Sequence, residues 1–290
     1  MTKKIALIND LSGFGRCSLT AAISTIAAMG VQPCPLPTAI LSAQTGYPTY
    51  FCDDYTDKME RFRQEWEKLR VVFDGIYTGF VASEAQIHHI FQFLDTFQTP
   101  GTFLLVDPVL GDNGKPYAMF TPTLCNLMKE LVQKADYITP NLTEFCLLTD
   151  TDYKTFENCT EPEHLINQIY RQALMLMEHG PNNIIVTGIE FSDSKTGEPQ
   201  MGNLYLTQKG CQMISFPYVG ESYSGTGDLF ASILAGGIAR GDDALSLISL
   251  AGKFIQQGIS DSAKEHIPRN DGINYEQYLW MLTQKGDSTS

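Results

Sequence analysis

The segment Gly225-Thr226-Gly227-Asp228 joins a glycine-rich turn to a carboxylate where a helix is expected to begin. Backbone N–H groups of such a turn have no intrahelical partner, so they can bind phosphate oxygens. The carboxylate of Asp228 can accept a proton from a substrate hydroxyl while these groups stabilise the charge of a transferring phosphoryl group. The same pattern fits an aspartate that only caps a helix after a tight turn, and taken alone it favours neither interpretation.

The residues after this turn predict the helix that would hold it. Apolar side chains recur at helical spacing from Gly227 to about Ala239, and a second helix is expected from Asp243 to about Gly258. Earlier in the chain, a helical stripe is formed by Met59, Phe62, Trp66 and Leu69.

Short apolar runs alternate with amphipathic helical segments, which predicts an α/β fold with a mostly parallel sheet. The segment from Val31 to Leu41 carries three alternating prolines, which favour an edge strand or an extended connection. Two runs near the C-terminal third predict an antiparallel hairpin. The expected strands are residues 4–9, 75–78, 103–106, 137–139 and 184–186, and the hairpin is residues 203–207 and 212–216.

Polar or small residues follow each of these strands. In open α/β sheets, ligands bind beyond the carboxyl ends of the strands, so these residues are expected to face one site. They are Asn9-Asp10, Thr78-Gly79, Asp107-Pro108, Asn141 and Thr187-Gly188.

Length and composition limit the possible classes of protein. The chain has 290 residues, of which 43% are hydrophobic, and we expect one domain over residues 1–285 with a frayed tail at 286–290. The formal net charge of -13 argues against nucleic acid and anionic membranes as partners. Any phosphate must therefore be held by local amides and a metal ion.

The cysteines indicate a reducing compartment. Seven are scattered along the sequence without a C-x-x-C pair, which is typical of a cytoplasmic protein with free thiols. No apolar stretch is long enough to span a membrane.

Two familiar nucleotide-binding patterns are incomplete. Gly13-Phe14-Gly15 follows the first strand, but Ser18 replaces the third glycine of a dinucleotide-binding turn. Gly114-Lys115 is followed by Pro116, so no P-loop is present.

The remaining motifs, in their order along nearly the whole chain, resemble those of the ribokinase-like superfamily and of its vitamin B6 kinase branch. They are Thr45-Gly46-Tyr47, Tyr77-Thr78-Gly79-Phe80, Asp107-Pro108-Val109-Leu110-Gly111-Asp112, Ile138-Thr139-Pro140-Asn141 with Glu144, Val186-Thr187-Gly188 and Gly225-Thr226-Gly227-Asp228.

This resemblance implies a three-layer α/β/α fold and an ATP-dependent kinase that phosphorylates the hydroxymethyl group of pyridoxal, pyridoxine or pyridoxamine. Asp228 would be the general base, beside an anion hole of Gly225, Thr226 and Gly227. Asp107 and Glu144 would hold Mg²⁺, partly through water, as suits hard oxygen ligands. The implied ATP-binding residues are Asp107, Asn141, Glu144, Thr187, Gly188, Phe216 and Val219. A monovalent cation and a homodimer are further expectations from the family.

By the same resemblance, the B6 ring would be lined by Asn9, Asp10, Ser12, Thr45, Tyr77 and Phe80, with Asp228 at the hydroxymethyl group. The chain departs from the pyridoxal kinases at two positions, since Asp10 replaces a serine and Phe80 a tyrosine. We expect Asp10 to favour a cationic group, such as a protonated ring nitrogen or the amine of pyridoxamine. The alternative is that Asp10 caps the following helix or bonds the Gly13-Phe14-Gly15 turn.

Other functions remain open from the sequence. The nearest is a hydroxymethylpyrimidine or hydroxymethylpyrimidine phosphate kinase, and a sugar kinase of the same superfamily fits the motifs less well. A regulator that binds B6 or a nucleotide without catalysis is the alternative from another class, although Asp228, Asn141 and Glu144 speak against it.

Overall fold

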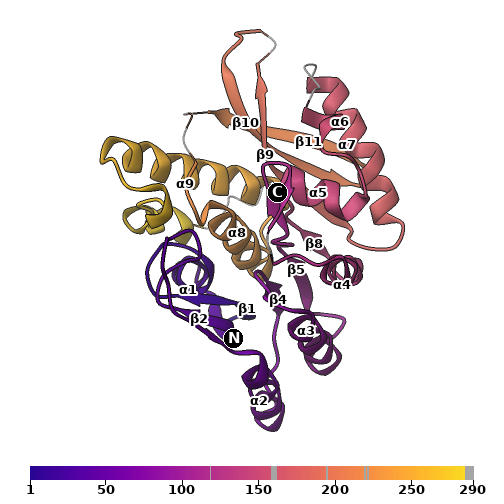
Figure 1. The fold of residues 1–290 in the computed structure, drawn as a ribbon, viewed down its shortest axis with the longest axis vertical. Coiled ribbons are helices and arrows are strands. Elements are labelled where there is room, and N and C mark those ends of the chain that lie inside the picture. The colour runs from indigo at the N-terminus through magenta and orange to yellow at the C-terminus, as the bar shows by residue number, and fades with distance from the viewer. Residues whose placement is uncertain (118, 158–161, 194, 219, 221, 285–290) are drawn as a thin grey trace. The chain divides into compact units, whose positions relative to one another are not determined.

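The computed structural model describes residues 1–117, 119–157, 162–193, 195–218, 220 and 222–284. The chain divides into two compact units (Figure 1). Unit 1 comprises Met1–Leu104 and Gly220–Ser290, and unit 2 comprises Leu105–Val219.

Unit 1 contains a sheet built on a fully buried strand, β1. Residues 5–8 of β1 have no exposed surface, as expected for a parallel strand covered on both faces. The strand order is β4-β1-β2-β3, in which β1 pairs in parallel with β2 and β4, and β3 is antiparallel to β2. The strands are β1 (Lys4–Ser12), β2 (Gln32–Leu41), β3 (Cys52–Asp54) and β4 (Gly75–Thr78).

The three prolines of β2 lie where the sequence predicts, beside an open edge. Gln32 donates its N–H toward β1, to the carbonyl of Lys3, so the alternate positions 33, 35 and 37 face away from β1. β3 covers only Ala39 to Leu41 of β2. The prolines therefore remove no hydrogen bond from the sheet.

Helices cover both faces of this sheet. α1 lies beside α8, which in turn packs against α9, while α2 and α3 lie on the opposite face (Figure 1). The right-handed rule for connections between parallel strands explains the two faces, because α1 leads from β1 to β2, whereas α2 lies in the connection from β2 back to β4 on the other side of β1. The helices are α1 (Ser18–Ala28), α2 (Thr56–Lys68), α3 (Glu84–Phe97), α8 (Thr226–Arg240) and α9 (Ala244–Lys264), followed by 3₁₀ turns η1 (Arg269–Asp271) and η2 (Glu276–Thr283).

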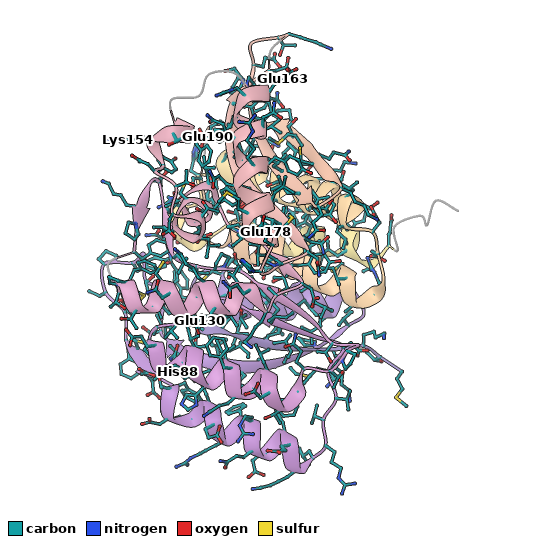
Figure 2. All side chains as sticks on the ribbon, turned by 90° about the vertical axis from the view of Figure 1, so that its right-hand side faces the viewer. His88, Glu130, Lys154, Glu163, Glu178 and Glu190 are labelled. Atoms are coloured by element: carbon teal, nitrogen blue, oxygen red, sulfur yellow. The ribbon has the colours of Figure 1, made fainter. Side chains whose placement is uncertain are left out.

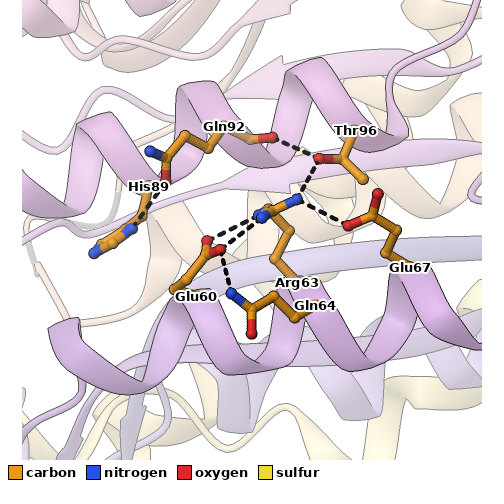
Figure 3. A network of polar contacts seen from close by, with 7 residues as sticks. All are labelled: Glu60, Arg63, Gln64, Glu67, His89, Gln92 and Thr96. Carbon is orange, nitrogen blue, oxygen red and sulfur yellow. Dashed lines mark hydrogen bonds and ion pairs between the residues drawn. The ribbon is translucent and has the colours of Figure 1, made fainter.

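A polar network joins α2 to α3 (Figure 3). Arg63 donates to both carboxylate oxygens of Glu60, at 2.8 and 2.5 Å, and to Thr96 Oγ1 of α3 at 2.9 Å. These bonds from Arg63 hold the pKa of Glu60 at about 2. The predicted helical stripe of apolar residues on α2 is wrong at Leu69. The helix stops at Lys68, and Leu69 is 73% exposed.

Unit 2 contains the strand order β5-β8-β9-β10-β11. β5, β8 and β9 are parallel, whereas β9, β10 and β11 form an antiparallel meander. The predicted hairpin is confirmed as β10–β11. β9 runs to Ser192 and is thus longer than expected, because its second half pairs with β10. The strands are β5 (Phe103–Val106), β6 (Gly111–Asp112), β7 (Lys115–Pro116), β8 (Tyr137–Ile138), β9 (Asn183–Ser192), β10 (Pro199–Thr207) and β11 (Gly210–Pro217).

The helices of unit 2 connect its parallel strands. α7 packs against β9 and β10, and Figure 2 shows Glu163 and Glu178 near its two ends. The helices are α4 (Pro122–Gln133), α5 (Leu142–Thr149), α6 (Lys154–Glu157) and α7 (Pro162–Met177). Within the described parts of both units, no helix has the length and apolar character needed to cross a membrane.

Candidate active site

The predicted anion-binding turn lies at the N-terminus of α8. Gly225 precedes the helix with φ +83°, and a Cβ there would lie 2.0 Å from the carbonyl oxygen of Arg16. Only glycine fits this position. The first intrahelical bond runs from Leu229 N–H to Gly225 O, so the amides of residues 226–228 have no partner within the helix. Gly227 is exposed, with no atom near the position of a Cβ.

Asp228 is half-buried on the first turn of α8, where two donors hold its carboxylate. Asn9 Nδ2 donates to Asp228 Oδ1 at 3.2 Å, and the backbone N–H of Ser18 donates to the same carboxylate. Burial raises the pKa of Asp228 to about 6, the charge of Asp10 adds to the rise, and the two hydrogen bonds oppose it. A carboxylate with this pKa is ionised at neutral pH and is a competent general base.

Asn9, predicted to line the B6 ring, makes a hydrogen bond to Asp228. Its Oδ1 accepts the N–H groups of Asp10 (2.9 Å) and Phe80 (2.8 Å), which leaves Nδ2 directed at Asp228. A Cβ at Gly79 would lie 2.5 Å from Asn9 Nδ2, so the glycine makes room for this amide. Asn9 is 1% exposed. Gly79 belongs to a motif that the sequence analysis identified, but the motif does not indicate that this glycine makes room for Asn9.

Asp10 and Ser12 lie at the end of β1 with their side chains turned toward each other. Ser12 Oγ donates to Asp10 Oδ2 at 2.9 Å, and the Ser18 hydroxyl also donates to this carboxylate. Burial raises the pKa of Asp10. These bonds join Asp10 to the end of β1 and to the first residue of α1, and not to the Gly13-Phe14-Gly15 turn named in the alternative interpretation. Burial and the charges of Asp228 and Asp10 raise the pKa of nearby Cys17 to about 12, so its thiol stays neutral.

The remaining predicted ring contacts differ in exposure. Thr45 is exposed and Phe80 is half-buried, whereas the side chain of Tyr77 is 1% exposed and belongs to the core of unit 1. Sequence reasoning missed Gln44, which is buried beside Thr45 and donates to the carbonyl of Asn270 at 3.1 Å.

In unit 2, Asn141 and Glu144 form a capping box at the start of α5. Asn141 Oδ1 accepts the N–H of Glu144 at 2.9 Å, and Glu144 Oε2 accepts the N–H of Asn141 at 2.8 Å. Asn141 Nδ2 also donates to the carbonyl of Gly111 at 2.9 Å. The cap thereby fixes the loop of the Asp-Pro-Val-Leu-Gly-Asp motif against α5.

Glu144 is 4% exposed, so it is not an exposed residue of a helix's first turn. Its Oε1 accepts the N–H of Leu110 at 3.1 Å, and the N–H of Gly111 also donates to the carboxylate. Burial raises the pKa of Glu144 to about 7, the charge of Asp112 adds to the rise, and the backbone donors oppose it. Glu144 therefore anchors the motif loop through the N–H groups of Leu110 and Gly111.

The other predicted nucleotide contacts lie on or beside three strands of unit 2, and Thr187 and Gly188 fall within β9 rather than at its end as predicted. Asp107 follows β5 and accepts from Thr139 Oγ1 at 3.0 Å. Thr187 donates its N–H to the carbonyl of Pro140 at 2.9 Å, and Gly188 has φ +68° with open space at its Cβ position. Phe216 is half-buried on β11, and Val219 lies outside the described residues.

Two of these side chains suit a magnesium ion. Among the described residues there is no group of three or more His, Cys, Asp or Glu side chains that could hold a metal by itself. Mg²⁺ is commonly bound by one or two carboxylates together with water and substrate phosphates. Asp107 and Glu144, both buried carboxyl groups, fit that donor set.

Comparisons with known proteins give consistent matches over nearly the whole chain. A family model described as phosphomethylpyrimidine kinase matches residues 15–271. The pyridoxal kinase of Dictyostelium discoideum is 26% identical over 301 residues, which cover 98% of this chain and 95% of that protein. A candidate phosphomethylpyrimidine kinase from Bacteroides thetaiotaomicron VPI-5482, crystallised with pyridoxal, is 37% identical, with a TM-score of 0.88 over 100% of this chain and 99% of that one. Pyridoxal kinase from Lactobacillus plantarum is 25% identical, with a TM-score of 0.82 over 97% of both chains.

Proposed function

The chain belongs to the phosphomethylpyrimidine kinase family, and we propose that it transfers the γ-phosphoryl group of ATP to the hydroxymethyl group of a B6 vitamer. This membership, together with the pyridoxal kinases among the relatives, confirms the predicted family and the enzyme class, a phosphotransferase with an alcohol acceptor. The solved relatives confirm the ribokinase-like fold, with a mostly parallel sheet between layers of helices.

The observation that carries the proposal is the environment of Asp228. A carboxylate with a pKa of about 6 stands on the first turn of α8, beside helix amides that have no intrahelical partner. Asp228 would remove the proton of the acceptor hydroxyl as the oxygen attacks phosphorus. The amides of residues 226–228 would stabilise the charge on the transferring phosphoryl group.

On the nucleotide side, we assign ATP to unit 2. Thr187 and Gly188 would contact phosphate oxygens, and Phe216 would lie near the adenine. Asn141 and Glu144 would hold the motif loop in place, as their bonds to Gly111 and Leu110 do in the structure. Asp107 and Glu144 would hold Mg²⁺, partly through water, and the ion would neutralise phosphate charge.

B6 vitamers are favoured as acceptors by the relatives. The Bacteroides protein, at 37% identity, was crystallised with pyridoxal. Phe80 and Thr45 remain the proposed ring contacts. Asp10 would favour a cationic acceptor only through its charge, because its oxygens already accept from Ser12 and Ser18.

Two features of the whole protein complete the proposal. We infer a homodimer from the family resemblance, with no assigned interface. We place the protein in the cytoplasm, since its six described cysteines are all free thiols.

The test is a coupled assay of ADP formation, with pyridoxal, pyridoxine, pyridoxamine and hydroxymethylpyrimidine as acceptors, with and without Mg²⁺. We expect turnover with at least one B6 vitamer and none in the absence of the metal ion. Turnover with hydroxymethylpyrimidine alone would replace this proposal with a role in pyrimidine phosphorylation, to which the family's description also points. No ADP formation with any acceptor would leave a binding protein without catalysis.

A further inference from the structure

The loop after β2, residues 44–47, is held by the turn η1 near the C-terminus of the chain. Gln44 Nε2 donates to the carbonyl of Asn270 at 3.1 Å, and Asn270 Nδ2 donates to the carbonyl of Gly46 at 2.7 Å. Tyr47 donates its hydroxyl proton to Asp271 Oδ1 at 2.5 Å. Three hydrogen bonds thus join two segments that lie more than two hundred residues apart.

The fit between the two segments is close. A Cβ at Gly46 would lie 2.8 Å from Asn270 Oδ1 and 2.9 Å from Gln44 Nε2. Gln44 Oε1 accepts the N–H of Gly46 at 2.7 Å, so both ends of this side-chain amide are bonded. In this arrangement the side-chain amides of Gln44 and Asn270 are both hydrogen-bonded.

The same turn, η1, is also bonded to the segment that carries the catalytic turn. Ser224, directly before Gly225, donates its N–H to the carbonyl of Arg269 at 3.1 Å. Arg16 donates its N–H to the carbonyl of Asp271 at 3.0 Å, and its own carbonyl is the atom against which Gly225 packs. Residues 269–271 therefore contact the loop 44–47 and both segments that position the start of α8.

The aromatic ring of Tyr47 adds an apolar contact to this arrangement. It packs on Phe14, with 5.5 Å between ring centroids. Burial and the neighbouring Asp271 raise the pKa of Tyr47 to about 12, so the hydroxyl stays protonated and donates over the whole working pH range.

We propose that Tyr47, Asn270 and Asp271 are positioning residues, which fix the loop carrying Thr45 relative to the catalytic turn and so set the affinity for the acceptor substrate. The inference rests on the proposed kinase function. It assigns a role in substrate binding to η1, which makes no direct contact with Asp228 among the hydrogen bonds of the described residues.

The test uses the full-length chain with Tyr47→Phe, Asn270→Ala and Asp271→Asn. We call the three hydrogen bonds between the loop 44–47 and η1 the clamp. Tyr47→Phe and Asn270→Ala each remove one of these bonds, and we expect the KM for the vitamer to rise about tenfold. The KM for ATP should stay within about twofold, because the proposed nucleotide residues belong to unit 2. Asp271→Asn keeps an oxygen that can accept from Tyr47, so it should have a smaller effect than Asp271→Ala.

The matched control is Asn274→Ala. Asn274 Nδ2 bonds Glu265 at 2.7 Å and takes no part in the clamp, so both KM values should match those of the wild type. A vitamer KM that stays within about twofold in both Tyr47→Phe and Asn270→Ala would overturn the inference. An equal rise in the KM for both substrates, with a lowered Tm, would overturn it as well, since it would indicate general destabilisation. Wild-type turnover in the same assay tests the kinase proposal separately.

Discussion

At the scale of single residues, the chemistry depends on how the protein holds the carboxylate of Asp228. Two donors, Asn9 Nδ2 and the backbone N–H of Ser18, oppose the rise in pKa that burial causes. Burial outweighs these two hydrogen bonds, so the carboxylate is a stronger base than that of an exposed aspartate. With a pKa of about 6 it is still ionised at pH 7.

Replacing Asp228 by asparagine should separate catalysis from folding. We expect kcat to fall by about 10²–10⁴-fold, because the amide cannot accept the proton of the acceptor hydroxyl, while ATP binding is retained. The measurement is steady-state turnover together with calorimetric titration of ATP. A loss of less than about fivefold in kcat would show that Asp228 is not the base.

The same substitution should stabilise the protein near pH 7.5. The pKa of Asp228 rises on folding from 3.8 to about 6, so its contribution is fully present below pH 3.8 and is lost as the pH rises through about 6. Asparagine carries no charge and therefore avoids this loss. The free energy of unfolding of Asp228→Asn at pH 7.5 should exceed that of the wild type by at most about 3 kcal/mol. Denaturant titrations at pH 7.5 and pH 5 should show the gain shrinking at the lower pH.

Asn9→Ala should change the pH dependence of turnover. The bond from Asn9 lowers the pKa of Asp228, so its removal should move the acidic limb of kcat/KM from about pH 6 to a higher pH. A profile of kcat/KM between pH 5 and 9 measures this limb. If the limb does not move while kcat/KM falls for the vitamer alone, Asn9 contacts the substrate, as the sequence first predicted.

At the scale of elements, the start of α8 depends on a backbone conformation. Gly225→Ala places a Cβ at φ +83° and 2.0 Å from Arg16 O, so we expect a loss of at least about 1–3 kcal/mol in the free energy of unfolding. Gly227→Ala is the matched control, since no atom lies within 4 Å of its Cβ position. Equal stability of the two variants would contradict this account of the turn.

The elements also show what a sequence can predict. The start of α8 and the proline-rich edge of β2 follow from local signals, a Gly-x-Gly-Asp turn and alternating prolines, and both are confirmed. The bond from Asn9 to Asp228 joins residues 219 positions apart, and the bond from Gln44 to Asn270 joins residues 226 apart. No local pattern encodes such pairs, because they arise only when strands and loops pack. The bond from the N–H of Leu110 to Glu144 arises in the same way, when the motif loop folds over that carboxylate.

At the scale of the whole molecule, the net charge is the reason that we expect turnover to need a metal ion. The net charge of -13 leaves no general attraction for ATP, so local amides and a cation must balance the phosphates. We expect EDTA to abolish turnover and added Mg²⁺ to restore it. Asp107→Asn should raise the Mg²⁺ concentration that gives half-maximal activity, measured at fixed ATP. Unchanged turnover in EDTA would contradict the role proposed for the two carboxylates.

The bond between Tyr47 and Asp271 spans 224 of the 290 positions of the chain. During synthesis, the loop 44–47 emerges from the ribosome long before η1 exists to hold it. If the three hydrogen bonds of the clamp position the loop as proposed, a nascent chain has no ordered acceptor pocket until residues 269–271 have been synthesised. Chains truncated before residue 269 should then neither bind a vitamer nor compete with finished enzyme for it.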